Sequence, residues 1–178
     1  IVLAASFASV LVKPCNCLPF FVHLWGGSET GKSLSLVLAA SVWANPEIGV
    51  YIQTFNATEV GKELGAAFCN SLPLIIDELQ LVKDNRKDFD KMIYQLSEGV
   101  GRTRGQKQGG LQKTPTWRNC IITTGEFPII SANSGEGAVN RTIEVDCHDT
   151  KLFDEPKKTA TELYSNYGFA GKEFVEHL

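Results

Sequence analysis

The stretch WGGSETGKSLSL, residues 25–36, contains the pattern that decides the fold. It has the form G-x-x-x-x-G-K-S, with its fixed positions at Gly26, Gly31, Lys32 and Ser33. A loop of this form wraps its backbone around phosphate oxygens, and the helix that follows points its amides at the same anion. The apolar run 19–25 predicts a strand before the loop, and 33–44 predicts a buried helix after it. This strand–loop–helix order predicts a nucleotide site.

The whole loop is expected to contact the nucleotide. The predicted binding residues are Gly26, Gly27, Ser28, Glu29, Thr30, Gly31, Lys32 and Ser33. In this position Lys32 is expected to neutralise the β- and γ-phosphates and so to assist catalysis, and the Ser33 hydroxyl is expected to bind Mg²⁺.

Two acids follow a second apolar run. The segment LPLIIDE, residues 72–78, predicts a strand that delivers Asp77 and Glu78 to the carboxyl edge of the sheet. We expect Asp77 to complete the Mg²⁺ site and Glu78 to polarise the attacking water. The adjacent glutamate favours hydrolysis over transfer to a small-molecule acceptor.

Two later positions complete the predicted catalytic set. The strand CIITTG, residues 120–125, ends in two threonines, and Thr124 is favoured over Thr123 as a hydroxyl near the γ-phosphate. Arg141 precedes a last predicted strand, RTIEVD at 141–146, from which it is expected to reach the γ-phosphate of a neighbouring subunit as an arginine finger.

Charge is distributed unevenly along the chain. The net charge is −3, yet the stretch from Gly99 to Gly125 has five basic residues and no acid. Its glycines predict a mobile loop, and Trp117 is a candidate stacking surface. The predicted nucleic-acid contacts are Arg102, Arg104, Lys107 and Lys113. A solvated surface loop is the alternative.

The overall pattern predicts an α/β fold, with a mostly parallel central sheet flanked by helices. Further segments with clear predictions are a first helix at about 1–12, a strand at 49–55, a helix begun by an Asn56–Glu59 cap, a helix carrying Phe89 and Leu96, and two C-terminal helices separated at Gly168. Residues 1–178 are expected to form one domain, with an N-terminal lead-in at 1–18, a core at 19–146 and a helical tail at 147–178.

The remaining observations concern the setting of the chain. It begins with Ile1 rather than Met, so we expect a segment of a longer protein. Its five scattered cysteines favour a reduced, cytoplasmic setting. The apolar start of the chain lacks a basic leader and is too short to span a bilayer, so no membrane association is expected.

With these motifs in place, the chain resembles the ATPase domain of prophage and mobile-element proteins, including the helicases of staphylococcal resistance cassettes. The similar stretches run from LWGGSETGKSLSLVLAASVWANP through LPLIIDEL, GVGRTRG and TWRNCIITTGE to NYGFAGKEFVEHL. The resemblance implies a P-loop NTPase core of the AAA+ kind, related to superfamily 3 and minichromosome-maintenance-type helicases. It also implies ATP with Mg²⁺, a homo-oligomeric ring, and DNA in a central channel.

Carried over by position, Lys32 and Ser33 match the phosphate-loop pair of that family, and Asp77 and Glu78 match its metal-binding and water-activating acids. Thr124 falls where the family more often has Asn, Arg141 lies near the finger, and 102–113 corresponds to a channel hairpin, although its glycines make a poor β-hairpin. The leading hypothesis is therefore an ATP-driven motor for single-stranded DNA. The alternative is an AAA+ ATPase that remodels or loads a protein.

Overall fold

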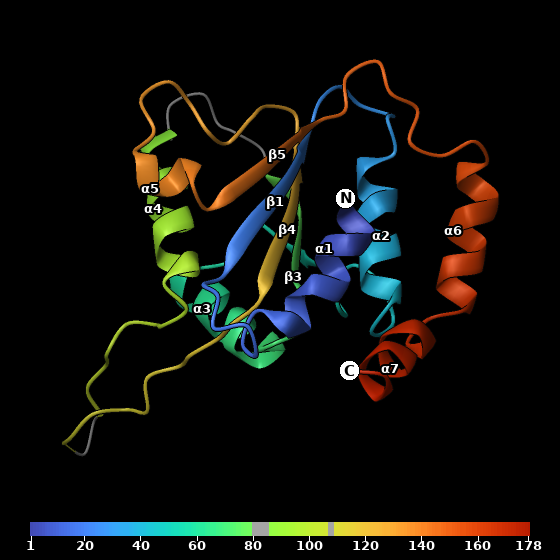
Figure 1. The fold of residues 1–178 in the computed structure, drawn as a ribbon. Helices are drawn as coiled ribbons and strands as arrows, with labels where there is room; N and C mark the ends of the chain where they lie inside the picture. Colours follow the sequence, from blue (N-terminus) through green and yellow to red (C-terminus); the bar gives the residue numbers. More distant parts are fainter. Residues whose placement is uncertain (80–85, 107–108) are drawn as a thin grey trace.

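The computed structural model describes residues 1–79, 86–106 and 109–178, with the backbone alone at residues 78–79 and 86–88. Within these residues, five parallel strands form a central sheet with helices on both faces (Figure 1). The strands are β1 (Phe20–Trp25), β2 (Gln53–Thr54), β3 (Leu74–Leu79), β4 (Cys120–Gly125) and β5 (Thr142–Asp146). The predicted α/β fold with a parallel sheet is confirmed.

The strand order β2-β3-β4-β1-β5 places β1 between two strands that come much later in the sequence. Phe20 of β1 pairs with Cys120 of β4, and Trp25 pairs with Gly125. On the other side, Trp25 pairs with Asp146 of β5. Because all strands are parallel, their carboxyl ends meet at one edge of the sheet, where open α/β folds bind ligands.

The helices form two layers, one on each side of the sheet (Figure 1). Their bounds are α1 (Val2–Ala8), the short 3₁₀ helix η1 (Ser9–Leu11), α2 (Lys32–Ser41), α3 (Glu59–Cys69), α4 (Arg86–Ser97), α5 (Glu136–Val139), α6 (Pro156–Ser165) and α7 (Phe169–Glu176). Phe21 and Ile121 pack in a core with α3, α4 and α5, whereas Val22 and Ile122 pack with α1 and α2. Successive residues of these strands therefore pack against opposite helix layers.

Two predictions about the segment between α2 and α3 are wrong in detail. The strand expected at 49–55 is reduced to Gln53–Thr54, because the chain turns at Gly49, where φ is +86° and the amide bonds to the Ile52 carbonyl. The cap of α3 is Thr58 rather than Asn56. The Thr58 hydroxyl accepts the Gly61 amide at 3.1 Å and so satisfies a first-turn donor.

The apolar stripe of α3 faces outward. Val60, Leu64 and Phe68 follow one another at helical spacing, yet their exposed fractions are 43%, 54% and 91%. The buried side of the helix instead contains Ala66 and the carboxylate of Glu63, which is 4% exposed. A polar contact on the inner side, described below, sets the rotation of α3.

The C-terminal helices agree with the sequence prediction. Gly168 adopts a φ of +82° between α6 and α7, and its amide donates to the Ser41 carbonyl at the end of α2. Helix α6 packs against α2 along the same layer. None of the described helices has both the length and the apolar character needed to cross a membrane.

Candidate functional site

The glycine loop, residues 26–31, joins the carboxyl end of β1 to α2. Gly26 and Gly31 have φ values of +141° and +100°, which other residues rarely adopt. Space is restricted at both positions. A Cβ on Gly26 would lie 3.0 Å from the His148 nitrogen, and one on Gly31 would lie 3.0 Å from the Phe153 ring. The segment after β5 therefore packs directly on the loop, and Leu152 donates its amide to the Thr30 carbonyl at 3.1 Å.

Helix α2 begins at this loop with Gly31 as its N-cap and, among the described residues, with no side chain capping its first-turn amides. These amides and the positive end of the helix dipole can therefore bind an anion. Lys32 Nζ lies over the same loop. It donates to the Gly26 carbonyl at 3.0 Å, the Gly27 carbonyl at 2.5 Å and the Thr30 hydroxyl at 3.4 Å. The loop thus gathers positive charge at the edge of the sheet.

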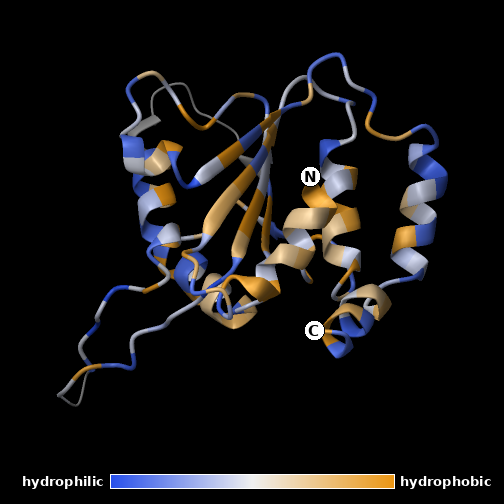
Figure 2. Ribbon diagram, viewed as in Figure 1, coloured by the Kyte–Doolittle hydropathy of each residue, from blue (hydrophilic) through white to orange (hydrophobic). Residues whose placement is uncertain are grey.

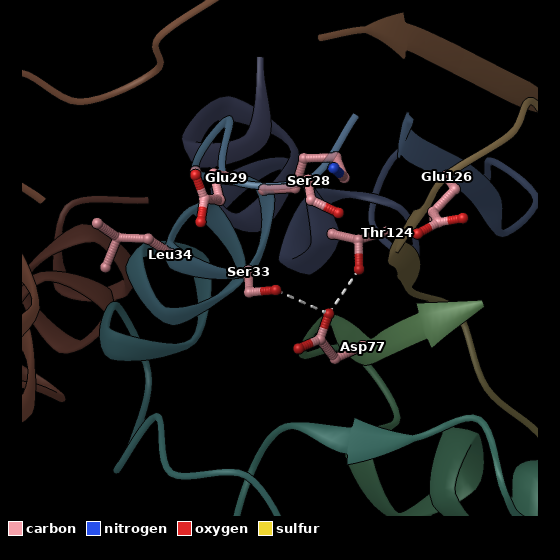
Figure 3. Close-up of a pocket in the computed structure, with 10 residues that line it drawn as sticks. Ser28, Glu29, Ser33, Leu34, Asp77, Thr124 and Glu126 are labelled. Carbon is pink, nitrogen blue, oxygen red and sulfur yellow. Dashed lines mark hydrogen bonds between the residues drawn. The ribbon is translucent and has the colours of Figure 1, made fainter. Parts of the chain in front are cut away.

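Asp77 of β3 links α2 to β4 (Figure 3). Its Oδ1 accepts hydrogen bonds from the Ser33 hydroxyl at 3.3 Å and from the Thr124 hydroxyl at 2.6 Å. The two residues predicted to bind a metal are therefore in contact, although they are 44 residues apart in sequence. Thr124 rather than Thr123 reaches this carboxylate.

A cavity of about 460 Å³ opens beside these groups, a volume typical of small-molecule sites. It is lined by Ser28, Glu29, Gly31, Lys32, Ser33, Leu34, Asp77, Thr124, Gly125 and Glu126. Most of the predicted nucleotide residues thus surround one pocket. The other three, Gly26, Gly27 and Thr30, lie beneath the Lys32 amine and accept its hydrogen bonds.

Thr123 faces the opposite side of the sheet, where it contacts a buried histidine. His23 Nδ1 lies 2.8 Å from the Thr123 hydroxyl, and Nε2 lies 3.0 Å from the Phe127 carbonyl. The pKa of His23 is lowered from 6.5 to about 4, mainly because the ring is buried. The bond to the Phe127 carbonyl acts against this shift, and the Lys32 charge adds to it. His23 is therefore neutral near pH 7. Since the carbonyl can only accept, Nε2 has the proton and Nδ1 accepts from Thr123.

The lowered pKa of His23 predicts a loss of stability in mild acid. Above pH 6.5 the ring is neutral in both the folded and the unfolded chain. Between pH 6.5 and about 4 the unfolded chain takes up a proton that the folded chain excludes. The free energy of unfolding therefore decreases as the pH is lowered through this range. By pH 5 the contribution lost is about 2 kcal/mol. Urea unfolding at pH 7 and pH 5 measures it, and His23→Gln should lose that share of the pH dependence. An equal dependence in both proteins would contradict the assignment.

Arg141 lies away from the pocket of its own chain. It precedes β5 at the amino end of the strand, and its carbonyl accepts the Phe21 amide. The guanidinium donates to the Gly137 carbonyl at 3.5 Å and lies 5.6 Å from the centre of the Tyr94 ring. Arg141 therefore does not line the described pocket, and its predicted role as an arginine finger stays a prediction.

The described parts of the basic loop, residues 100–106 and 109–116, project from the body of the molecule (Figure 1) and are hydrophilic along most of their length (Figure 2). We call residues 100–116 the basic arm. Its two sides run antiparallel, with isolated bridges between Val100 and Thr116 and between Gly105 and Leu111. The hairpin implied by the resemblance is thus present as a sparsely bonded form, which agrees with the low strand propensity of its glycines.

Both arginines of the basic arm are already paired with α3. Arg104 Nη2 lies 2.6 Å from a carboxylate oxygen of Glu63, and Arg102 Nη2 lies 2.9 Å from one of Glu59. The Glu63 carboxylate also accepts the Arg102 amide at 3.3 Å. Glu63 is almost fully buried, so this contact fixes the base of the arm and explains why α3 turns its acidic side inward.

The other predicted nucleic-acid residues have different surroundings. Lys113 is exposed and forms no ion pair within the described part of the chain. Lys107 lies outside the described residues. Trp117 is not a stacking surface, because it is 1% exposed and donates its indole N–H to the Leu96 carbonyl at 2.7 Å. That prediction is wrong, since the indole fills the core between α4 and the sheet.

The site contains one carboxylate that the sequence analysis did not select and one predicted group whose position is not described. Glu126 follows β4 directly and lines the cavity opposite the glycine loop (Figure 3). The rule that selected Asp77, an acid at the carboxyl end of an apolar strand, applies to Glu126 as well. Glu78 lies in β3, but its side chain is outside the described part of the structure.

The parallel sheet, the glycine loop after its central strand and the pocket at its carboxyl edge define a P-loop NTPase-like α/β fold. The chain belongs to the family described as "Domain of unknown function (DUF927)", whose model matches residues 1–117. This match includes the glycine loop and β3 and ends before β4. No curated protein matches the chain.

Solved structures align with this chain over nearly its whole length. One, titled "SCCmec type IV Cch - active helicase", aligns with 99% of this chain at 24% identity and a TM-score of 0.73. This chain spans 34% of that longer one, about a third of its length. A second, "The X-ray structure of Inhibitor Bound to JCV Helicase", aligns with 98% of this chain and 54% of its own, at 10% identity and a TM-score of 0.45.

Proposed function

We propose that this chain is the ATP-hydrolysing motor domain of a DNA helicase or translocase, part of a prophage or mobile-element replication protein. One observation carries the ATPase part: Lys32, Ser33, Asp77 and Thr124 converge on one pocket from the start of α2 and from two strands. In this site the glycine loop and Lys32 bind the phosphates, and Thr124 senses the γ-phosphate. Glu78 activates water, and Arg141 acts on the nucleotide of a neighbouring copy in a ring.

The chemistry of the pocket fits Mg²⁺. Ser33 and Asp77 offer a hydroxyl and a carboxylate, the hard oxygen ligands that Mg²⁺ prefers. Across the described residues no three His, Cys, Asp or Glu side chains form a metal site of their own, so the ion would arrive with the nucleotide and keep phosphate oxygens and water as ligands. When bound, Mg²⁺ supplies charge neutralisation on the phosphates.

The hydrolysis test is ATP turnover by the wild type and by Glu78→Gln. We expect the variant to lose turnover by about 100-fold or more while ATP still binds, because the amide cannot accept a proton from the attacking water. The control is Glu136→Gln, which removes a carboxylate of α5 that does not line the pocket. Turnover that Glu78→Gln leaves unchanged would contradict the role of Glu78.

The nucleic-acid part rests on the basic arm. We expect single-stranded DNA at low salt to stimulate turnover, and Lys113→Ala to reduce the stimulated component about threefold or more, because an exposed lysine is free to contact phosphate. Basal turnover should stay within about twofold, since Lys113 is remote from the pocket. Lys157→Ala, at the exposed start of α6, is the matched control. Changes at Arg102 and Arg104 are less suitable, because they would also detach the arm from α3.

A second candidate is an AAA+ ATPase that remodels or loads a protein. The observation that favours it is the arm itself, whose two arginines are neutralised by Glu59 and Glu63, while Leu111 near its tip is 70% exposed. This function predicts turnover that requires Glu78 and does not respond to DNA. The same assay therefore separates the two candidates.

A further inference from the structure

A polar row crosses the sheet directly behind the pocket. His23 of β1 pairs in register with Thr123 of β4 on one side and with Glu144 of β5 on the other. His23 and Thr123 are fully buried. Buried polar side chains are costly unless they are hydrogen-bonded, so the partners of this row indicate what it holds in place.

The partners all lie in one segment, residues 126–135, which we call the connector. The His23 ring donates to the Phe127 carbonyl at 3.0 Å, across a sequence separation of 104. Glu144 accepts the amides of Ile129 at 2.7 Å and Ile130 at 3.1 Å. Two adjacent strands thus fix the backbone at three residues, Phe127, Ile129 and Ile130, of a segment outside regular secondary structure.

The two ends of the connector lie at the pocket and at α5. At its start, Glu126 lines the pocket and follows Thr124, whose hydroxyl bonds to Asp77. At its end, Gly135 is the N-cap of α5, the short helix that leads to Arg141. The two consecutive threonines of β4 have different partners. Thr124 faces the pocket, whereas Thr123 donates to His23 on the opposite face of the sheet.

We propose that His23 is a positioning residue of the nucleotide site: together with Thr123 and Glu144 it holds the connector so that Thr124 and Glu126 face the pocket. This role rests on the proposed ATPase function.

The test combines two measurements on His23→Leu, which removes both ring hydrogen bonds. Hydrogen exchange at the Ile129 and Ile130 amides should become about 10-fold faster, because the connector is released. The turnover number should fall about 10-fold, while the Kd for ATP changes less than about threefold, because the glycine loop is held independently by the segment after β5. His23→Gln keeps a donor for the Phe127 carbonyl and should recover most of both properties.

Ser9→Ala is the matched control for a general loss of stability. Ser9 is also fully buried, and it bonds to the Ser71 carbonyl at 2.8 Å and to the Cys120 amide at 3.0 Å, at the far end of β4. Connector exchange that is unchanged in His23→Leu, or raised equally in Ser9→Ala, would overturn the proposal. Absence of turnover in the wild type would contradict the ATPase function instead, and the exchange data would still decide whether His23 holds the connector.

Discussion

Lys32→Ala is expected to weaken ATP binding by about 100-fold and to abolish measurable turnover at millimolar ATP. The side chain places its charge over the glycine loop, at the point where the first-turn amides of α2 converge. No other lysine or arginine lines the described pocket, so nothing compensates for its loss. Titration of the protein with a fluorescent ATP analogue in the presence of Mg²⁺ measures the effect.

The control for this change is stability. Among the described residues, the Lys32 amine hydrogen-bonds only to atoms of the glycine loop, so urea unfolding of Lys32→Ala should match that of the wild type within about 0.5 kcal/mol. Lys13→Ala, at an exposed position after η1, should leave ATP binding unaltered. Unchanged affinity in Lys32→Ala would contradict the assignment of the pocket to phosphate.

Asp77→Asn is expected to lower turnover by about 100-fold and to remove the dependence of ATP affinity on Mg²⁺. The amide can still accept hydrogen bonds from Ser33 and Thr124, so the local structure should persist while the negative charge is lost. ATP affinity measured across a range of Mg²⁺ concentrations gives the answer.

A carboxylate outside the site provides the comparison for Asp77. Asp154→Asn changes an exposed residue that precedes α6 and does not line the pocket. It should retain the Mg²⁺ dependence of the wild type. If Asp77→Asn retains it too, the metal site lies elsewhere.

The sequence was most informative where one local pattern determines an element. The strand predicted at 120–125 has those bounds in the structure, and Phe89 and Leu96 are buried on α4 as their spacing predicts. The contact between Asp77 and Ser33 is predicted by the rule that parallel strands present their carboxyl ends at one edge of the sheet. These features depend on periodicity and chain direction, which a sequence displays directly.

The features that the sequence did not reveal depend on contacts between distant segments. The outward rotation of α3 follows from the pairing of Glu63 with Arg104, which are 41 residues apart. Trp117 is an aromatic residue in a basic stretch, which suggests stacking on bases. In the structure it is buried, and its indole N–H donates to the Leu96 carbonyl of α4. His23 belongs to no local sequence motif, because Thr123 comes 100 residues later in the chain. Local propensity carries no information about such pairings.

Alanine scanning of the glycine loop would mix two effects at Gly26 and Gly31. An added methyl group at either position meets a neighbouring segment at 3.0 Å, so lost binding in those variants would report a displaced backbone. Gly27 differs, because no described heavy atom outside its immediate neighbours lies within 4 Å of a Cβ placed there. A small side chain introduced at Gly27 therefore has open space in the described structure, which makes this position the place in the loop for a spectroscopic reporter.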